Sequence, residues 1–310
     1  MTKQSLHEKL THQIVEAMES ATNFQMPWHT EQELPQNALT SNNYKGINTV
    51  SLWACTMQKH YDSSHWATYK QWHELDAQVK KGERGSTIVI YKPLIGNDGE
   101  PIYFTEPPYR QKVFMRSASV FNANQVTGWQ SDSIISKPTI DLTSKLANVD
   151  AYVSATKASI TIGGHQSYYN GKADKINIPE RHLFNGSTTC SPTEAFYSTL
   201  LHELVHWTGT EKRCNRDHTG RFGNSAYAKE ELVAELGSAF LCADLGITSS
   251  PREDHASYIK NWIKVLKNDN KAIFLAASNA TTAVNYLNHL QLDEAIQPIT
   301  AIQQSLNLKH

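Results

Sequence analysis

The feature that most constrains the fold is the segment His202–His206 (His-Glu-Leu-Val-His), which has the spacing His-Glu-x-x-His. Ahead of it, Ser191–Glu194 (Ser-Pro-Thr-Glu) combines a capping box with proline at the first helical position. Gly209 stands where a C-terminal cap belongs. These signals predict a helix, on which His202 and His206 lie one turn apart on the same face.

Two imidazoles with this spacing are typical of a site for one divalent metal ion. Glu203, next to the first histidine, can reach a water molecule bound to that ion and act as a general base. The alternative is an ordinary amphipathic helix that carries three polar residues. A chance match to the pattern is expected in on the order of a few per cent of chains with this histidine content. The helical context favours the metal site.

A third metal ligand is expected downstream of this helix. A histidine at position 212 would indicate a metzincin, but Lys212 stands there. The segment Tyr227–Gly246 predicts a second helix, which is apolar or small on nearly every side from Leu232 to Ala243. Glu231 and Glu235 lie one turn apart on one face of it. A buried carboxylate is costly without a partner, and a metal with its ligands supplies one. We therefore predict Glu231 as the third ligand and Glu235 as the acceptor of a hydrogen bond from a ligating histidine, although the two roles can be exchanged.

Two other side chains near this pair are weaker candidates for the metal site. We expect Glu230 to be solvated, and His218, between the two helices, is the rival third ligand. A set of two histidines and one glutamate does not separate zinc from manganese or cobalt. Zinc, with one ion per chain, is the expected cofactor, and the other two metals are alternatives.

A site of this kind suits hydrolysis of a peptide bond by metal-activated water. A peptidase also needs an extended strand that pairs with its substrate, and Lys175–Pro179 is predicted to be an edge strand. A plain sheet edge without that role is the alternative. The candidate donors to an oxyanion are Tyr168, Tyr169 and Tyr227.

The chain of 310 residues is long enough for two domains. A Ser- and Thr-rich stretch predicts a linker at 131–144, between domains at 1–130 and 145–310. Short β-branched runs among helical segments predict an α+β class, with a small antiparallel sheet and helices in the second domain. Scattered cysteines, a polar N-terminus and the lack of an apolar run of membrane-spanning length indicate a cytoplasmic protein without a membrane partner.

The first domain carries aromatic side chains interleaved with basic ones. This pattern suits single-stranded nucleic acid, because rings stack on bases while cations follow the phosphates. The balance of 29 Lys and Arg against 30 Asp and Glu excludes a wholly basic coat, so binding has to depend on a local strip. The alternative is that the rings belong to the core. The predicted DNA-contact residues are Trp66, Tyr69, Lys70, Trp72, Lys80, Lys81, Arg84 and Lys92.

Several of these segments together resemble the ArdC family of antirestriction proteins. The similar segments are Tyr44–Asn48, Trp66–Trp72, Val79–Gly85 and Phe121–Gly128 in the first domain, and His202–Gly209 and Tyr227–Glu235 in the second. The second group looks like the zincin-type metallopeptidase domain of that family. The resemblance covers about residues 5–250, in the same order, and residues 250–310 carry no motif that matches.

The resemblance implies a protein of conjugative plasmids that binds single-stranded DNA and protects incoming DNA from host restriction enzymes. It also implies a zinc-dependent peptidase-like site, whose motif falls on His202, Glu203 and His206, and a possible protein substrate such as a component of the restriction system. Two alternatives stay open. One is a single-strand DNA-binding protein whose metal site is structural or vestigial, and the other is a plain intracellular metallopeptidase.

Overall fold

We describe the fold from a computed structural model of the chain, for residues 4–21, 26–30, 33–105, 111–130, 142–187, 190–216, 225–249 and 255–307. The elements of the N-terminal part are α1 (Leu6–Ser20), α2 (Pro27–Thr30), β1 (Gln36–Asn37), α3 (Ile47–Lys59), β2 (His65–Ala67), α4 (Tyr69–Glu74), β3 (Gln78–Val79), β4 (Ser86–Pro93), β5 (Val113–Asn122), a 3-10 turn (Ala123–Gln125) and β6 (Val126–Thr127). Those of the C-terminal part are α5 (Leu142–Ala155), β7 (Ser159–Ile162), β8 (Tyr168–Asn170), β9 (Lys175–Ile178), a 3-10 turn (Arg181–Leu183), α6 (Pro192–Trp207), α7 (Ser225–Leu245), α8 (His255–Asn268) and α9 (Ala272–Asn307). This mixture of helices and small sheets confirms the predicted α+β class.

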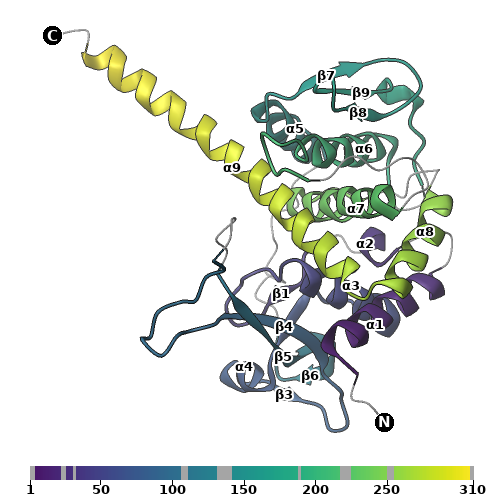
Figure 1. The fold of residues 1–310 in the computed structure, drawn as a ribbon, viewed down its shortest axis with the longest axis vertical. Helices are drawn as coiled ribbons and strands as arrows, with labels where there is room; N and C mark the ends of the chain where they lie inside the picture. Colours follow the sequence, from purple (N-terminus) through teal and green to yellow (C-terminus); the bar gives the residue numbers. More distant parts are fainter. Residues whose placement is uncertain are drawn as a thin grey trace.

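The N-terminal sheet has the strand order β1-β2-β5-β4. The strands β4 and β5 form a long antiparallel hairpin, paired from Ser86↔Val120 to Pro93↔Val113. β-Branched residues dominate β4, which explains why this stretch is extended. The part of the hairpin beyond Val89 and the loop that follows it project from the body of the molecule (Figure 1). We call the described residues of this projection, 90–105 and 111–116, the arm.

The C-terminal sheet has the order β7-β9-β8, so β9 lies at its centre. β9 pairs in parallel with β7 and antiparallel with β8. The prediction that Lys175–Pro179 is an edge strand is therefore wrong, because both sides of this strand hold a neighbour. The sheet covers α5 and α6, and α7 lies beneath α6 (Figure 1). The strand at the edge next to the loop after α6 is β8, not β9.

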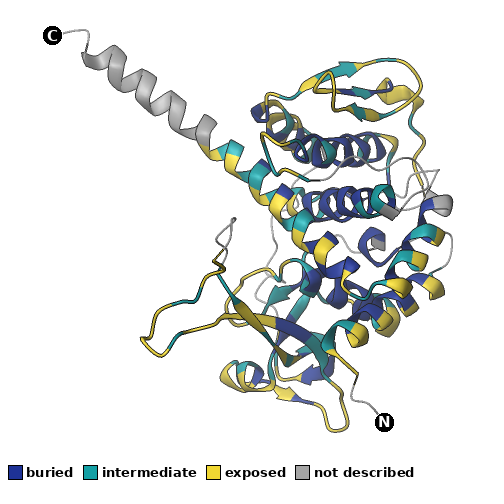
Figure 2. Ribbon diagram, in the orientation of Figure 1, coloured by how far each residue is buried: buried dark blue, intermediate teal, exposed yellow. Residues whose placement is uncertain are grey.

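One hydrophobic core passes through both parts of the chain. It joins Leu10, Trp28 and Trp53 to Phe240 on α7 and Trp262 on α8. Helix α7 is consequently enclosed by α6 on one side and by the N-terminal helices on another, and both α6 and α7 are buried along most of their length (Figure 2). The predicted linker lies outside the described residues up to position 141, and α5 begins at Leu142. The division into domains stays a prediction.

None of the helices in the described part of the chain is both long enough and apolar enough to cross a membrane.

Candidate metal centre and nucleic-acid surface

Helix α6 begins as its sequence predicts. The Ser191 hydroxyl accepts the backbone N–H of Glu194 at 3.3 Å, and the Glu194 carboxylate accepts the backbone N–H of Ser191 at 3.0 Å. Pro192 occupies the first turn, where no backbone donor is needed. The helix runs to Trp207, so the motif His202–His206 lies in its last turns, next to the loop that leads to α7.

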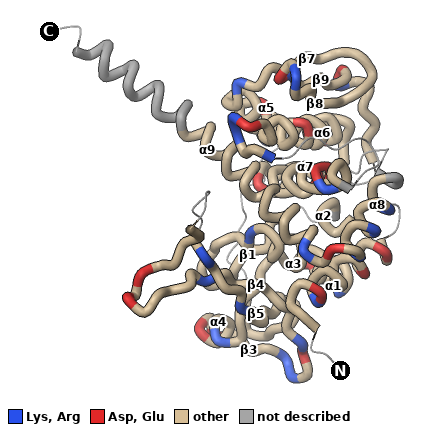
Figure 3. The backbone as a smooth tube through the Cα atoms, in the orientation of Figure 1, with Lys and Arg blue, Asp and Glu red and all other residues tan. Residues whose placement is uncertain are grey.

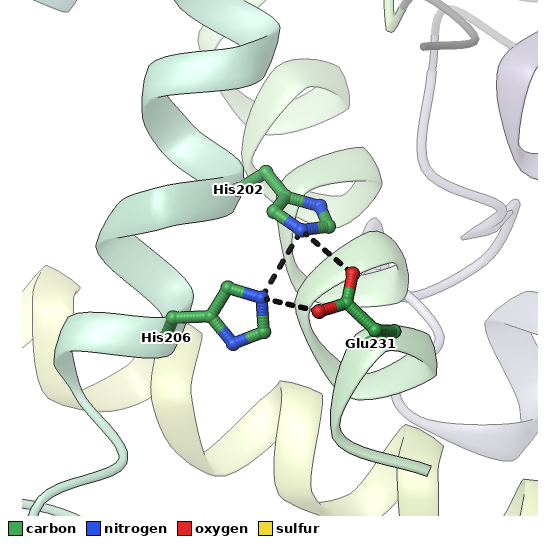
Figure 4. A group of neighbouring side chains, drawn as sticks. All are labelled: His202, His206 and Glu231. Atoms are coloured by element: carbon green, nitrogen blue, oxygen red, sulfur yellow. Dashed lines mark hydrogen bonds and ion pairs between the residues drawn. The ribbon is translucent and has the colours of Figure 1, made fainter. Parts of the chain in front are cut away.

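His202 and His206 on α6 converge with Glu231 on α7 (Figure 4). The two Nε2 atoms are 3.2 Å apart. One Glu231 oxygen lies 3.5 Å from His202 Nε2 and the other lies 3.4 Å from His206 Nε2. The three donor groups lie within 4.8 Å of one another. The structure thus brings together the three residues that the sequence predicts as metal ligands.

The other nitrogen of each imidazole faces a carboxylate of its own. His202 Nδ1 lies 3.6 Å from a Glu235 oxygen, and His206 Nδ1 lies 3.1 Å from a Glu230 oxygen. A carboxylate in this position favours the hydrogen on Nδ1, which leaves the lone pair of Nε2 for a cation. Glu235 lies beside His202, in the place that the sequence predicts for an oriented partner of a ligating histidine.

Glu230 is buried, and the prediction that it is solvated is wrong. Its carboxylate receives Arg216 Nε at 3.0 Å and Arg216 Nη2 at 2.9 Å, besides its contact with His206. Burial opposes the charge of Glu230, but His206 and Arg216 outweigh it and lower the pKa of Glu230 to about 2. Arg216 also donates to the Val205 carbonyl at 2.6 Å, which anchors the segment after α6 beside the site.

The electrostatics around the three donor groups favour a positive charge between them. Burial opposes the charge on His206, but Glu231 and Glu230 outweigh it and raise the pKa of His206 to about 10. Burial opposes the charge on Glu231 as well, yet His206 and His202 hold the pKa of Glu231 far below its usual range. Two imidazole nitrogens and one carboxylate, buried and already ionised in this way, fit a divalent cation that replaces the protons.

The site opens into a cleft of about 830 Å³, which Glu203, His206 and Glu231 line on one side and β8 on the other. All three candidate oxyanion donors also line this cleft. The Tyr169 hydroxyl donates to Asp174 at 2.8 Å, whereas the Tyr227 hydroxyl lies 3.2 Å from that of Tyr258. Burial, the contact with Tyr258 and the charge of Glu231 raise the pKa of Tyr227 and keep it a hydrogen-bond donor. The rival ligand, His218, lies outside the described residues.

Two residues that the sequence analysis did not single out also reach this region. Trp28 and His29 on α2 both contact the Glu235 carboxylate, across more than 200 positions of the chain. Both side chains are buried. A histidine beside a tryptophan in a short helical segment carries no recognisable motif, so only the folded chain reveals the contact.

The predicted DNA-contact residues separate into two groups. Trp66 and Trp72 have exposed fractions of 0%, and the Trp72 indole donates to the Phe121 carbonyl at 3.0 Å, so neither ring has a face for a base. These two predictions are wrong because both rings pack in the small cores beside the N-terminal sheet. The six others are exposed: Tyr69, Lys70, Lys80, Lys81, Arg84 and Lys92. Tyr69, Lys80 and Lys81 line a shallow hollow of about 670 Å³.

Comparison with known protein families gives two matches that together span most of the chain. Residues 4–121 match the N-terminal domain of the anti-restriction factor ArdC, and residues 147–279 match a zincin-like metallopeptidase. Among curated proteins, the chain is 36% identical over 298 residues to the uncharacterized protein y4eC of Sinorhizobium fredii, with 94% of each covered. It is also 33% identical over 303 residues to a DNA primase TraC of Escherichia coli, of which it spans 20%.

Two solved structures have the same fold, and both are of the antirestriction ArdC protein from the R388 plasmid. The metal-free structure superposes with a TM-score of 0.74 at 31% identity, covering 94% of this chain and 99% of that one. The Mn(II)-bound structure superposes with a TM-score of 0.72 at 32% identity, covering 93% of this chain and 98% of that one. The likeness therefore extends over both parts of the fold.

Proposed function

The chain belongs to the ArdC family of antirestriction proteins, and on that premise we propose that it binds single-stranded DNA during conjugative transfer and protects it from host restriction enzymes. It would act in the cytoplasm of the recipient cell, where the transferred strand meets the restriction system. The whole-length likeness to an antirestriction protein supports this proposal, and so does the similarity to part of a DNA primase.

The second part of the proposal is a divalent metal ion, zinc in the first instance, held by His202, His206 and Glu231. The observation that carries it is the pair of buried carboxylates behind the two imidazoles, Glu235 and Glu230, because they direct both Nε2 atoms toward Glu231. When bound, the ion supplies Lewis-acid chemistry suited to hydrolysis of a peptide bond. The Mn(II)-bound structure of the related plasmid protein supports a divalent ion and keeps manganese as the second candidate.

The residues around the cleft have complementary tasks in such a reaction. Glu203 lines the cleft and accepts the proton of the attacking water. Tyr227 donates a hydrogen bond to the oxygen on which negative charge develops. The edge strand β8 pairs with an extended substrate by its backbone, a role that the sequence analysis gave to β9.

The arm supplies the DNA-binding surface that the buried tryptophans do not. The register pairs Lys92 with Phe114 and Ile90 with Arg116, so these four side chains share one face of the hairpin. Neither β4 nor β5 contains an aspartate or a glutamate. Lys112 Nζ lies 5.2 Å from the centre of the Phe104 ring, beside this face. Exposed rings are flanked here by cations, and the acidic side chains among the described residues of the arm lie at its tip (Figure 3), which suits stacked bases and phosphates.

The test compares transfer of DNA into restricting recipients that express the wild-type protein or Glu203→Ala. We expect Glu203→Ala to keep its metal and its affinity for single-stranded DNA, and to lose protection. Full protection by Glu203→Ala would favour the alternative, in which the protein protects by coating DNA and the metal is structural. If the wild-type protein does not bind single-stranded DNA, the result would favour the other alternative, a plain metallopeptidase.

A further inference from the structure

Two side chains from the N-terminal part of the chain contact a carboxylate behind the metal centre. Trp28 Nε1 donates to Glu235 Oε1 at 3.1 Å, and His29 Nε2 is hydrogen-bonded to the same oxygen. The exposed fractions of Trp28, His29 and Glu235 are 0%, 5% and 5%. Water is thus kept away from these contacts, and the two donors have to satisfy this carboxylate oxygen.

The hydrogen bonds of His29 define which of its nitrogens carries the hydrogen. The backbone N–H of Met26 donates to His29 Nδ1 at 3.2 Å, so Nδ1 is an acceptor. The hydrogen therefore resides on Nε2, from which it is donated to Glu235. With Oε1 taken by two donors, the second oxygen of Glu235 faces His202 Nδ1 at 3.6 Å.

The two donors are held by packed structure. The Trp28 ring lies against Trp262 of α8, with ring centres 6.3 Å apart, and α2 contacts both α3 and α7. These neighbours belong to the core shared by the two parts of the chain. Close packing therefore keeps α2 in place. If a substitution removes one of its two donors, α2 cannot move to restore the contact, and the orientation of Glu235 should change.

We propose that Trp28 and His29 are positioning residues of the metal centre, which orient Glu235 so that it holds His202 with Nε2 toward the cation. The inference rests on the proposed metal site. The two ligating histidines then differ in which part of the chain supports them. Arg216, in the C-terminal part, orients the carboxylate behind His206, whereas α2, in the N-terminal part, orients the carboxylate behind His202. The segment lies outside residues 147–279, which match the metallopeptidase family, so that stretch does not contain its whole metal centre.

The experiment uses the full-length protein and the variants Trp28→Phe, His29→Ala and His29→Gln. Trp28→Phe removes one hydrogen-bond donor and keeps a ring of similar shape. Trp72→Phe is the matched control, since it removes an equally buried indole donor in the core beside the N-terminal sheet. The measurements are the Zn²⁺ dissociation constant, by competition with a chromophoric chelator, and the visible spectrum of the Co²⁺-loaded protein.

Loss of an outer partner of a metal-bound histidine typically weakens metal affinity by about 10–100-fold. We expect His29→Ala to fall near the lower end of that range, Trp28→Phe to lose less, and His29→Gln to recover part of the loss through its amide N–H. The Co²⁺ spectrum should shift in His29→Ala and not in Trp72→Phe. Such a shift reports ligand geometry, which a loss of stability alone does not change.

Each outcome has a separate meaning. A wild-type protein that binds neither Zn²⁺ nor Co²⁺ would remove the proposed metal site itself. A wild type that binds metal, with Trp28→Phe and both His29 variants binding equally well and with the same Co²⁺ spectrum, would overturn this inference and leave the site intact. An equal loss in Trp72→Phe would also overturn it. If His29→Ala does not fold, Trp28→Phe and His29→Gln decide the question.

Discussion

The metal centre and the arm differ from ordinary protein structure in opposite ways. The metal centre buries charged side chains, and the arm exposes large apolar ones. Between α6 and α7, five ionisable side chains are buried: His202, Glu203, Glu230, Glu231 and Glu235. On the arm, large apolar side chains are exposed, among them Tyr91, Phe104 and Phe114. Figure 2 shows the two regions at opposite extremes of burial. Buried charge and exposed rings are the informative departures from the usual pattern, because each is costly unless something binds there.

The two regions therefore require partners of different kinds. The buried centre has one position between three donor groups and therefore selects a small cation by geometry. The arm offers an open face whose cations and rings accept a flexible polyanion with little demand on shape. Changes in the first region should alter metal affinity and its dependence on pH, whereas changes in the second should alter DNA affinity and its dependence on salt.

The largest expected effect is the loss of a metal ligand. Glu231→Ala removes the only carboxylate oxygens between the two Nε2 atoms among the described residues. Metal affinity should fall by more than the ~10–100-fold that loss of an outer partner costs, because a ligand itself is gone. Metal content after dialysis measures this. If Glu231→Ala kept a full equivalent of metal, the third ligand would have to be another residue, and Glu235 would be the next one to test.

The second prediction concerns pH. Since the metal-free protein keeps His206 protonated up to a pKa of about 10, metal binding near neutral pH must release this proton. Metal affinity should then rise by about tenfold for each pH unit below that pKa. Titrations of Zn²⁺ between neutral and mildly alkaline pH measure the slope, and Glu230→Gln should reduce it by lowering the pKa of His206. DNA affinity should not follow the same slope, and a shared slope would contradict the separation of the two regions.

The sequence predicts those parts of the site that depend on short-range periodicity. The helix around His202 and His206 follows from its caps, and the approach of Glu231 and Glu235 follows from their spacing on an apolar helix. The burial of Glu230 does not follow, because it depends on Arg216, which comes from outside α7. The contact of Trp28 and His29 with Glu235 spans the two parts of the fold, which no local pattern encodes.

The errors in the N-terminal part have a related cause. A tryptophan on a short strand or helix has the same local pattern whether its ring faces a core or the solvent. Trp66 and Trp72 are enclosed because β5 pairs with β2, which places Val120 in the small core of Trp66 and Phe121 against that of Trp72, and this pairing is set by the register of the whole sheet. The exposure of the lysines follows from their chemistry, since long charged side chains are rarely buried without a partner, and their contact with DNA stays a prediction.

The third prediction tests the arm by removing one ring. Phe114→Ala should weaken binding of single-stranded DNA by about 1–3 kcal/mol, the usual contribution of one stacked base. Its thermal stability should be almost unchanged, because the exposed fraction of Phe114 is already 41%. Fluorescence anisotropy with a labelled oligonucleotide measures the affinity. Trp66→Ala is the contrast, since deletion of a fully buried ring should cost about 3–5 kcal/mol of folding free energy.

The smallest expected effect comes from a single cation. Lys92→Ala removes one exposed charge from the face that carries Phe114, and if it neutralises one phosphate, the slope of log affinity against log salt should fall by about 0.7. Lys260→Ala, which removes an exposed charge from α8 in the other part of the molecule, is the control and should leave the slope unchanged. Equal slopes in the wild type and both variants would mean that the DNA follows another path, past Lys80, Lys81 and the hollow beside Tyr69. A reduced slope in Lys92→Ala alone would place the phosphates on the arm, since salt dependence counts the phosphate contacts that a protein makes.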